Sequence, residues 1–428
     1  MEKAKYFHSV TLDKDLCKGC TNCVKRCPTE AIRVRNGKAI IIKERCIDCG
    51  ECIRVCPQHA KKAIVDPLGV LSNYRYTVAL PAPTLYAQFK KLDSIDLLLT
   101  ALLRIGFDDV FEVAVAAEVV SAETRRMLAT ENLPLPVISS ACPAVLRIIR
   151  VRFPELIPNV LELRSPMEFS ARWAKQRAAK RTGLDPKEIG CIFISPCPAK
   201  VTSMKMPLGT EESCVDAVVS IAEIYPKLRA ALKKLSSEPI SHAGALGIGW
   251  ATAGGECAGI KKPDYLAADG IENVIRVLEA LEDDKINDVE FVELNACVGG
   301  CVGGVLTVES PFIARARLKR LIDKRAALPP PEPLEPPPGD LHWDYDITYE
   351  PVMRLDDDIT TAMQKLARIQ ELEAGFNGMD CGACGAPSCR ALAEDIVGGY
   401  ADEDLCIFRM REKLQALLKE GKSEEELK

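Results

Sequence analysis

Two cysteine runs with identical spacing stand near the N-terminus, and they constrain the fold more than any other feature of the chain. The runs are CKGCTNCVKRCP and CIDCGECIRVCP, each with the pattern C-x2-C-x2-C-x3-C-P. In this pattern three thiolates surround one iron-sulfur cluster, and the fourth crosses to the cluster of the other run. A zinc ribbon, the alternative, requires only two well-separated pairs of thiols. We therefore predict two 4Fe-4S clusters, held by Cys17, Cys20, Cys23 and Cys56 and by Cys46, Cys49, Cys52 and Cys27.

Composition points to metal ligation as the use of most remaining thiols. The chain has 19 cysteines, too many for disulfides in a cytosolic protein, because the reducing thiol pool keeps such bonds open. The net charge of -5 provides no basic field for nucleic acid. The N-terminal residues lack the apolar core of a signal peptide, and no apolar run approaches the length of a membrane span. We expect a soluble, cytoplasmic protein with no nucleic-acid partner and no membrane span.

A third cysteine group lies near the C-terminus with the spacing C-x2-C-x4-C-x16-C. It consists of Cys381, Cys384, Cys389 and Cys406. Gly382 and Gly385 allow the backbone to turn tightly, and the stretch after Arg390 has the pattern of a helix that returns the fourth ligand. The spacing predicts a small, mostly helical 4Fe-4S domain, similar to one found in several electron-transfer and corrinoid proteins. Four thiolates also suit zinc, so a zinc knuckle is the alternative.

The segment between the cysteine groups alternates apolar runs with amphipathic stretches. The runs YTVALPA, LPVIS, IGCIFIS and DVEFVEL predict strands, whereas SIDLLLTALLRIGF, SPMEFSARWAKQRAAKRTG and ENVIRVLEALED have helical spacing. Strands separated by helices imply parallel sheets in an α/β domain. The stretch PPPEPLEPPPGD predicts an extended connector, beyond which we expect a separately built, movable domain. The expected organisation is an α+β domain resembling a bacterial ferredoxin at 1–75, the α/β domain at 76–327, the linker at 328–358 and the C-terminal domain at 359–428.

Three of the predicted strands lead directly into cysteine. LPVISS precedes Cys142, CIFISP precedes Cys197, and FVELNA precedes Cys297, with Cys301 four residues later. Ligands of open α/β sheets bind outside the carboxyl ends of the strands. We therefore expect these four thiols to meet at one place, where they match the requirement of a cubane cluster for four thiolates.

The three cysteine loops resemble those of the iron-only (FeFe) hydrogenases. SSACPAV, SPCPAK and ELNACVGGCVGG correspond, in order, to the T-S-C-C-P-x-W, M-P-C-x-x-K and E-x-M-A-C-x-x-G-C-x-x-G-G loops of that family. The resemblance extends from the ferredoxin-like module to about residue 325. It implies hydrogen-activating chemistry at a cofactor made of a 4Fe-4S cluster joined to a two-iron subsite with carbonyl, cyanide and dithiolate ligands.

The resemblance also implies a role for each central residue. Cys142, Cys197 and Cys297 would hold the 4Fe-4S part, and Cys301 would in addition bridge to the two-iron subsite. Lys200 would donate a hydrogen bond to a cyanide ligand of that subsite.

Several positions depart from the pattern of fast members of the family. Ala141 stands where they carry a proton-donating cysteine, Ser195 and Asn295 replace packing methionines, and Val145 replaces a tryptophan. The glutamates of their proton relay would fall near Thr124 and Met127. The nearby acids that could substitute are Glu118, Glu123, Glu256 and Glu293. Because one positioned donor contributes about 100- to 10,000-fold to the rate, we expect slow turnover.

These departures favour a low-activity hydrogenase of the divergent, sensory branch. It would interconvert H2 with protons and electrons, relay the electrons through its clusters and report to a redox partner such as a ferredoxin or a signalling protein. One alternative is an electron-transfer or scaffold protein without the two-iron subsite, and another is a fast, energy-coupled hydrogenase subunit. Lys200 and the four central cysteines favour the hydrogenase over the scaffold, and Ala141 argues against the fast enzyme.

Overall fold

The computed structural model describes residues 7–419 except 234, 338, 340 and 353. Contacts divide these residues into two compact units. The first unit contains residues 7–9, 47–50 and 63–350, and the second contains 10–46, 51–62 and 351–419. None of the described helices is both long and apolar enough to cross a lipid bilayer.

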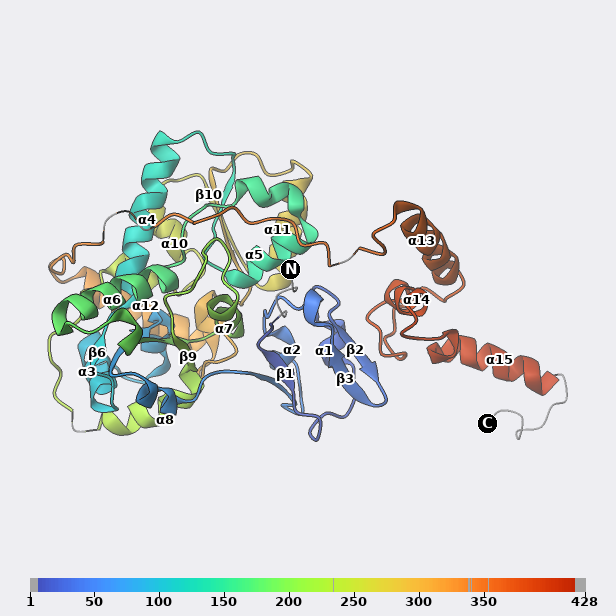
Figure 1. The fold of residues 1–428 in the computed structure, drawn as a ribbon, viewed down its shortest axis with the longest axis horizontal. Helices are drawn as coiled ribbons and strands as arrows, with labels where there is room; N and C mark the ends of the chain where they lie inside the picture. The colour runs from blue at the N-terminus through green and yellow to red at the C-terminus, as the bar shows by residue number, and fades with distance from the viewer. Residues whose placement is uncertain (1–6, 234, 338, 340, 353, 420–428) are drawn as a thin grey trace. The chain divides into compact units, whose positions relative to one another are not determined.

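The first unit is built on two parallel sheets (Figure 1). The four-stranded sheet has the order β6 (Asp109–Val110), β5 (Tyr76–Pro81), β8 (Ile189–Ser195) and β9 (Ala217–Ser220). The three-stranded sheet has the order β10 (Tyr265–Asp269), β11 (Phe291–Asn295) and β7 (Val137–Ile138). All seven residues of β8 are buried, as expected of a central parallel strand covered on both faces.

Helices connect and cover these strands. They are α3 (Ile95–Arg104), α4 (Val113–Thr130), α5 (Pro143–Arg152), α6 (Pro166–Thr182), α7 (Pro198–Lys205), α8 (Ile221–Ala231), α9 (Ala245–Gly249), α10 (Gly255–Ile260), α11 (Ile271–Glu282) and α12 (Pro311–Ala326). Helix α6 illustrates how local residues determine where a helix begins and ends. The Ser165 side chain accepts from the Glu168 backbone N–H at its start, and Gly183 takes a left-handed conformation (φ 72°) at its end. The helix packs against β5, β8 and α4.

The predicted α/β architecture with parallel sheets is confirmed. The four predicted strands correspond to β5, β7, β8 and β11, and the three predicted helices correspond to α3, α6 and α11. Sequence reasoning missed β6, β9 and β10, which have two, four and five residues. Apolar runs this short do not distinguish a strand from a buried helical segment.

The second unit combines the N-terminal module with the C-terminal helices. Its strands are β1 (Val10–Leu12), paired with β4 (Lys61–Ala63), and the antiparallel hairpin of β2 (Ile32–Arg35) and β3 (Lys38–Ile41). Its helices are α1 (Asn22–Lys25), α2 (Glu51–Arg54), α13 (Ile359–Ala374), α14 (Cys389–Val397) and α15 (Ile407–Lys419). The predicted α+β N-terminal module and helical C-terminal region are confirmed. The sequence led us to expect a separate C-terminal domain, whereas the contacts place it in one unit with the ferredoxin-like residues.

Part of the predicted linker is bound to the first unit. Residues 341–350, here called the strap, exchange backbone hydrogen bonds with the main body at Leu341, Trp343 and Asp344. The guanidinium of Arg164, buried in the first unit, pairs with the Asp344 carboxylate at 2.5 Å and also donates to Thr210. The boundaries proposed for the linker stay predictions, but its second half is not a free connector.

Arg164→Ala should release the strap. The lost hydrogen bonds to charged groups cost on the order of 2 kcal/mol, and the strap becomes more open to protease. Limited proteolysis should therefore cut faster within residues 341–350. Lys319→Ala, which removes an exposed pair with Asp323, is the control and should leave the cleavage rate unchanged. Equal cleavage of both variants would show that other contacts hold the strap.

Candidate metal centre

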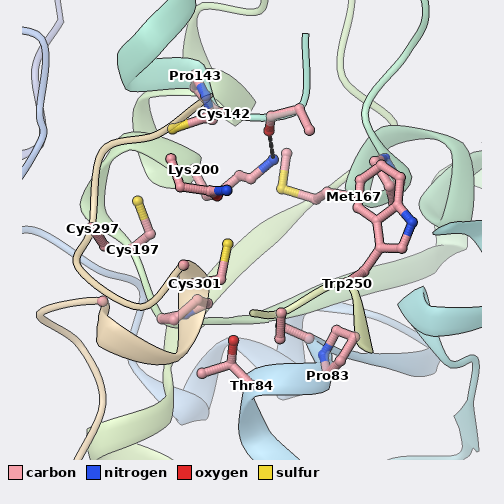
Figure 2. A pocket seen from close by; sticks show the side chains of 18 of the residues that line it. Pro83, Thr84, Cys142, Pro143, Met167, Cys197, Lys200, Trp250, Cys297 and Cys301 are labelled. Atoms are coloured by element: carbon pink, nitrogen blue, oxygen red, sulfur yellow. Dashed lines mark hydrogen bonds between the residues drawn. The ribbon is translucent and has the colours of Figure 1, made fainter. Parts of the chain in front are cut away.

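A cavity lies where strands of both parallel sheets end. The four central cysteines line it together with Cys49, and Figure 2 shows the thiols of Cys142, Cys197 and Cys301 directed into it. The fourth is Cys297, which follows β11. The structure therefore brings together the four central cysteines that the sequence predicted to meet.

Proline determines how two of these cysteines enter the cavity. Cys142 is the residue before α5 and Cys197 the residue before α7, and each is followed by a proline at the first helical position. A residue before proline is held in an extended conformation, and proline at this position starts a helix without losing a hydrogen bond. Each strand therefore passes through a cysteine into a helix by a sharp turn.

Glycine allows the third cysteine loop to approach the opposite wall. Gly300 has a positive φ of 84°, and a Cβ added there would lie 2.5 Å from the Ala253 backbone nitrogen. This close contact lets the Val302 backbone N–H donate to the Ala251 carbonyl at 3.0 Å. Cys301, one residue after Gly300, is thereby held against the segment that carries Trp250.

Burial makes the central thiols poor acids. It raises the pKa of Cys197 to about 12, and the neighbouring charges of Cys142 and Cys301 add to the rise. Burial also raises the pKa of Cys301 to about 11, with the charge of Cys142 in the same direction and Lys200 opposing. Because metals bind thiolates, occupation of this cavity must release protons. The donor set fits an iron-sulfur cubane, which requires four thiolates in one place.

Lys200 lies in α7, one turn after Cys197, and its ammonium group enters the same cavity. Its Nζ donates to the Ala141 carbonyl oxygen at 2.9 Å, as Figure 2 shows. Ala141 also lines the cavity, so this position offers a methyl group and no transferable proton.

Ser195 and Asn295 have different surroundings. Ser195 is fully buried at the end of β8 and is not among the residues lining the cavity. Its Oγ accepts from the Cys197 backbone N–H at 3.0 Å and donates to the Cys197 carbonyl at 2.9 Å, so it closes the turn that places the cysteine. Asn295 lines the cavity, and its amide donates to a carboxylate oxygen of Glu293 at 2.7 Å.

Two of the four candidate acids reach the cavity. Glu256 accepts a hydrogen bond from the Ser139 hydroxyl at 2.6 Å, and Glu293 accepts from the backbone N–H groups of Gly254 and Cys257 at 3.0 Å each. Burial raises the pKa of Glu256 to about 8, with the charge of Glu293 adding to the rise. Burial also raises the pKa of Glu293, against the lowering effect of its backbone donors.

The other two acids serve the scaffold. Glu118 accepts from the Gly247 backbone N–H at 2.9 Å, and Glu123 pairs with Arg126 and His342. At the positions of the expected relay, the Thr124 hydroxyl donates to the carbonyl of its own helix at Val120, and Met127 is buried in a hydrophobic core.

The cavity wall contains residues that sequence reasoning did not single out. Met167 from α6 and Trp250 after α9 both line it, and the Trp250 indole N–H donates to Ser121 on α4 at 2.8 Å. Met167 had no local sequence signal, whereas Trp250 belongs to the Gly-rich stretch GWATAGGE. Val145 is buried in a neighbouring core, and Cys257 packs in another, outside the lining residues.

The ferredoxin-like runs contribute in two places. In the second unit, Cys17, Cys20, Cys23 and Cys56 line one small cavity, the set predicted for the first cluster. In the first unit, Cys49 lines the wall of the central cavity. A Cβ at the next residue, Gly50, would lie 2.7 Å from the Val305 side chain, so only glycine allows this approach. Of the predicted second set, Cys27, Cys46 and Cys52 pack in the core of the second unit.

The C-terminal cysteines also come together. Cys406 is buried in a core against which Cys384 and Cys389 pack. Burial raises the pKa of Cys384, and the charges of Cys381 and Cys406 act in the same direction, which requires the three thiols to be neighbours. Gly382 and Gly385 both have positive φ angles, as the tight turns of a cluster loop require.

Three family models match the chain. The model for the C-terminal domain of the iron-only hydrogenase large subunit matches residues 75–262 and 250–305. A 4Fe-4S dicluster domain matches residues 9–57, and an Fe-S cluster model matches residues 377–408. The chain therefore carries iron-sulfur cluster domains at both ends.

Curated relatives and solved structures agree with these models. Iron hydrogenase 1 of Clostridium pasteurianum is 26% identical over 368 residues, which cover 69% of this chain and 64% of the relative. The periplasmic Fe hydrogenase large subunit of Nitratidesulfovibrio vulgaris is 26% identical over 362 residues, covering 69% and 86%. The fold is similar to that of FeFe-hydrogenase HydA1 from Chlamydomonas reinhardtii, with a TM-score of 0.50 at 18% identity over 67% of this chain and 98% of that chain.

The raised pKa of Glu256 has a testable consequence. With a pKa of about 8, this carboxyl group keeps its proton at pH 7 and loses it as the pH rises through 8. Infrared spectra should show the C=O band of a buried carboxylic acid at pH 7 that fades toward pH 9. Glu256→Gln should remove the band, whereas Glu118→Gln, outside the cavity, should keep it. A band that persists in Glu256→Gln would assign the proton to another acid.

Proposed function

Because the chain belongs to the iron-only hydrogenase family, we propose that it interconverts H2 with two protons and two electrons in the central cavity. One observation carries this proposal. Four cysteines from three distant segments and the ammonium group of Lys200 line a single cavity at the carboxyl ends of two parallel sheets. An electron-transfer domain has no need of a cationic side chain and a space beyond its four thiols.

The residues of the cavity have distinct roles in this proposal. Cys142, Cys197, Cys297 and Cys301 would hold a 4Fe-4S cluster, and Cys301 would in addition hold a two-iron subsite with carbonyl, cyanide and dithiolate ligands. That subsite, when bound, supplies the metal chemistry that makes and breaks the H–H bond. Lys200 offers its Nζ as a hydrogen-bond donor to an anionic ligand, and its bond to the Ala141 carbonyl fixes the direction of the ammonium group.

Part of the surrounding wall is apolar. Met167 and Trp250 line the cavity beside Ala141, and none of these side chains carries a charge. Where such side chains exclude water from a bound cofactor, the electrostatic contact of Lys200 with its partner would be strengthened. Protons would then have to arrive through side chains.

Proton delivery is the weak step of the proposed reaction. The side chain at Ala141 has no proton to give, and Thr124 and Met127 provide no carboxyl group behind it. Glu256 is the protonated acid that the cavity offers instead, connected through Ser139 to the backbone of Ala141. We infer that turnover is slow and that the protein reports the presence of H2 or the redox state to a partner, with electrons passing through its 4Fe-4S clusters.

The second candidate is an electron-transfer or scaffold protein without a two-iron subsite. The departures at Ala141, Ser195 and Asn295 favour it, because these positions differ from the loops of fast hydrogenases. The retention of Lys200 in the cavity favours the hydrogenase, since a cubane alone gives this ammonium group no ligand.

Infrared spectroscopy of the matured protein separates these candidates. We expect cyanide and carbonyl stretching bands that shift under H2, because each reports a ligand of the two-iron subsite. Cys301→Ala removes the proposed bridging thiolate and should abolish these bands, while Cys214→Ala, outside the cavity lining, should keep them. A matured protein with full iron content and no such bands would establish the second candidate.

Ala141→Cys tests the account of slow turnover. The new thiol restores a donor beside the cofactor, but the path behind it still lacks carboxyl groups at Thr124 and Met127. Hydrogen evolution with a reduced dye should therefore rise less than about tenfold, although one positioned donor contributes about 100-fold or more when the rest of the path is present. A gain of 100-fold would show that the remaining path is complete.

A further inference from the structure

The C-terminal cysteine loop lies directly on the β2–β3 hairpin of the second unit. The Val34 backbone N–H donates to the Gly385 carbonyl at 2.8 Å, and Arg35 donates to the Cys384 carbonyl at 3.1 Å. A Cβ at Gly385 would lie 2.1 Å from the Val34 carbonyl oxygen, and its φ is 79°. Only glycine therefore allows the loop to approach the hairpin this closely.

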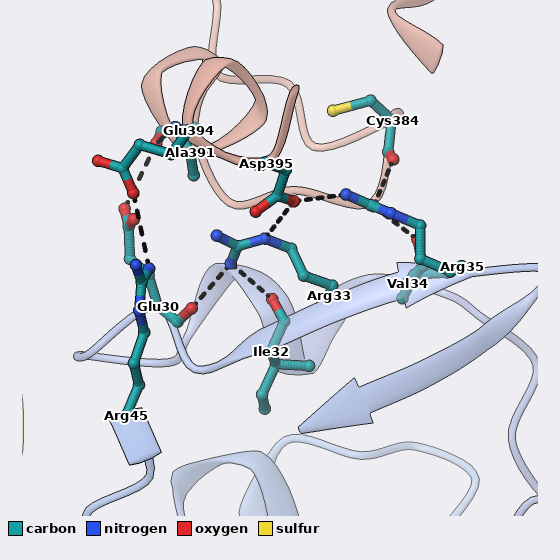
Figure 3. A network of polar contacts seen from close by, with 11 residues as sticks. Glu30, Ile32, Arg33, Val34, Arg35, Arg45, Cys384, Ala391, Glu394 and Asp395 are labelled. Carbon is teal, nitrogen blue, oxygen red and sulfur yellow. Dashed lines mark hydrogen bonds and ion pairs between the residues drawn. The ribbon is translucent and has the colours of Figure 1, made fainter. Parts of the chain in front are cut away.

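A buried carboxylate holds this contact together (Figure 3). Asp395 of α14 accepts from Arg33 at 2.7 Å and from Arg35 at 2.5 Å. Exposed fractions of the three side chains are 9% for Asp395, 5% for Arg33 and 17% for Arg35, so water screens the pairs little. Weaker contacts surround them, among them Arg45 with Glu394 at 3.6 Å. Loss of the carboxylate would leave two largely buried cations without their partner.

Val34 connects the two cysteine groups of this unit. Its side chain lines the small cavity of Cys17, Cys20, Cys23 and Cys56. Its backbone binds Gly385, the residue after Cys384. Val34 therefore contacts both the cavity predicted for the first ferredoxin cluster and the C-terminal cysteine loop.

We propose that Asp395 clamps the C-terminal cysteine loop to the hairpin through Arg33 and Arg35, and so makes these cysteines the outer end of the electron relay. This rests on the proposed 4Fe-4S occupancy of both cysteine groups. One electron leaves the cluster of Cys17, Cys20, Cys23 and Cys56, which is oxidised, and reduces the cluster of the C-terminal cysteines by one electron. No bond is made and no proton moves.

Charge near the loop gives the relay a direction. Arg33 and Arg35 face Asp395, and Arg45 faces Glu394, so acids offset most of the positive charge of the network. Arg35 is the arginine of this network that reaches the cysteine loop, where its guanidinium donates to the Cys384 carbonyl at 3.1 Å. The positive charge of this guanidinium favours the reduced cluster, which is more negative, and so raises its reduction potential. Arg35 therefore acts as a positioning residue that draws electrons outward.

Electron paramagnetic resonance of the full-length, cluster-loaded and reduced protein tests the clamp. In the native chain the C-terminal cluster signal should be broadened by the nearby ferredoxin cluster. Asp395→Asn should lose this broadening, and Asp357→Asn, which removes only an exposed pair with Arg354, should keep it. Arg35→Gln should lower the reduction potential of the C-terminal cluster, and Arg35→Lys, which keeps the charge, should restore most of it.

Each remaining outcome decides against a defined part of the proposal. Unchanged broadening in an Asp395→Asn protein with full iron content would overturn the clamp. If Asp395→Asn loses iron from the C-terminal site, the Arg35→Gln variant becomes the deciding test. An unchanged reduction potential of the C-terminal cluster in that variant would overturn the role proposed for Arg35. Zinc at the C-terminal cysteines, or no broadening in the native chain, would overturn the relay. Neither result would affect the hydrogen chemistry proposed for the first unit, which the carbonyl and cyanide bands test separately.

Discussion

The central cavity depends on a property of parallel sheets: every strand presents its carboxyl end at the same edge. Because β7 and β11 of one sheet and β8 of the other each lead into a cysteine loop, the carboxyl edges of the two sheets bring together sulfur atoms from three distant parts of the chain. Burial then raises the pKa values of Cys197 and Cys301 far above neutrality. Metals bind thiolates, so a metal cluster that occupied the cavity would displace these protons.

Helix α7 fixes the positions of two functional groups relative to each other. Its preceding residue, Cys197, supplies a thiol, and Lys200, one turn later, supplies the ammonium group. Ser195 bonds to both backbone groups of Cys197, and Lys200 bonds to the backbone beside Cys142. A shift of any one of these elements would therefore move a ligand and the cation together. This coupling explains why a serine outside the cavity lining still belongs to the site.

Local patterns were enough to predict that the four central cysteines gather, because three predicted strands lead into their loops. Each of these strands is rich in apolar residues. Contacts between residues far apart in the sequence could not be predicted, because local spacing carries no information about them. Ser139 meets Glu256 across 117 residues, and Arg33 meets Asp395 across 362. For the same reason, the packing of the C-terminal domain on the hairpin was not predicted. The proline-rich segment that precedes this domain indicated only a movable connector.

The proposed slow turnover is compatible with an acid in the cavity, because an acid serves catalysis only where a path resupplies its proton. Burial raises the pKa of Glu256 to about 8, which is close to the range of an effective proton donor. Glu293 is buried beside it, and two such carboxyl groups cannot both ionise without strong repulsion. Thr124 and Met127 offer no carboxyl group at the positions of the expected relay, so resupply of the proton would limit the rate. A slow site would still suit the proposed report of H2, since an equilibrium position does not depend on the rate at which it is reached.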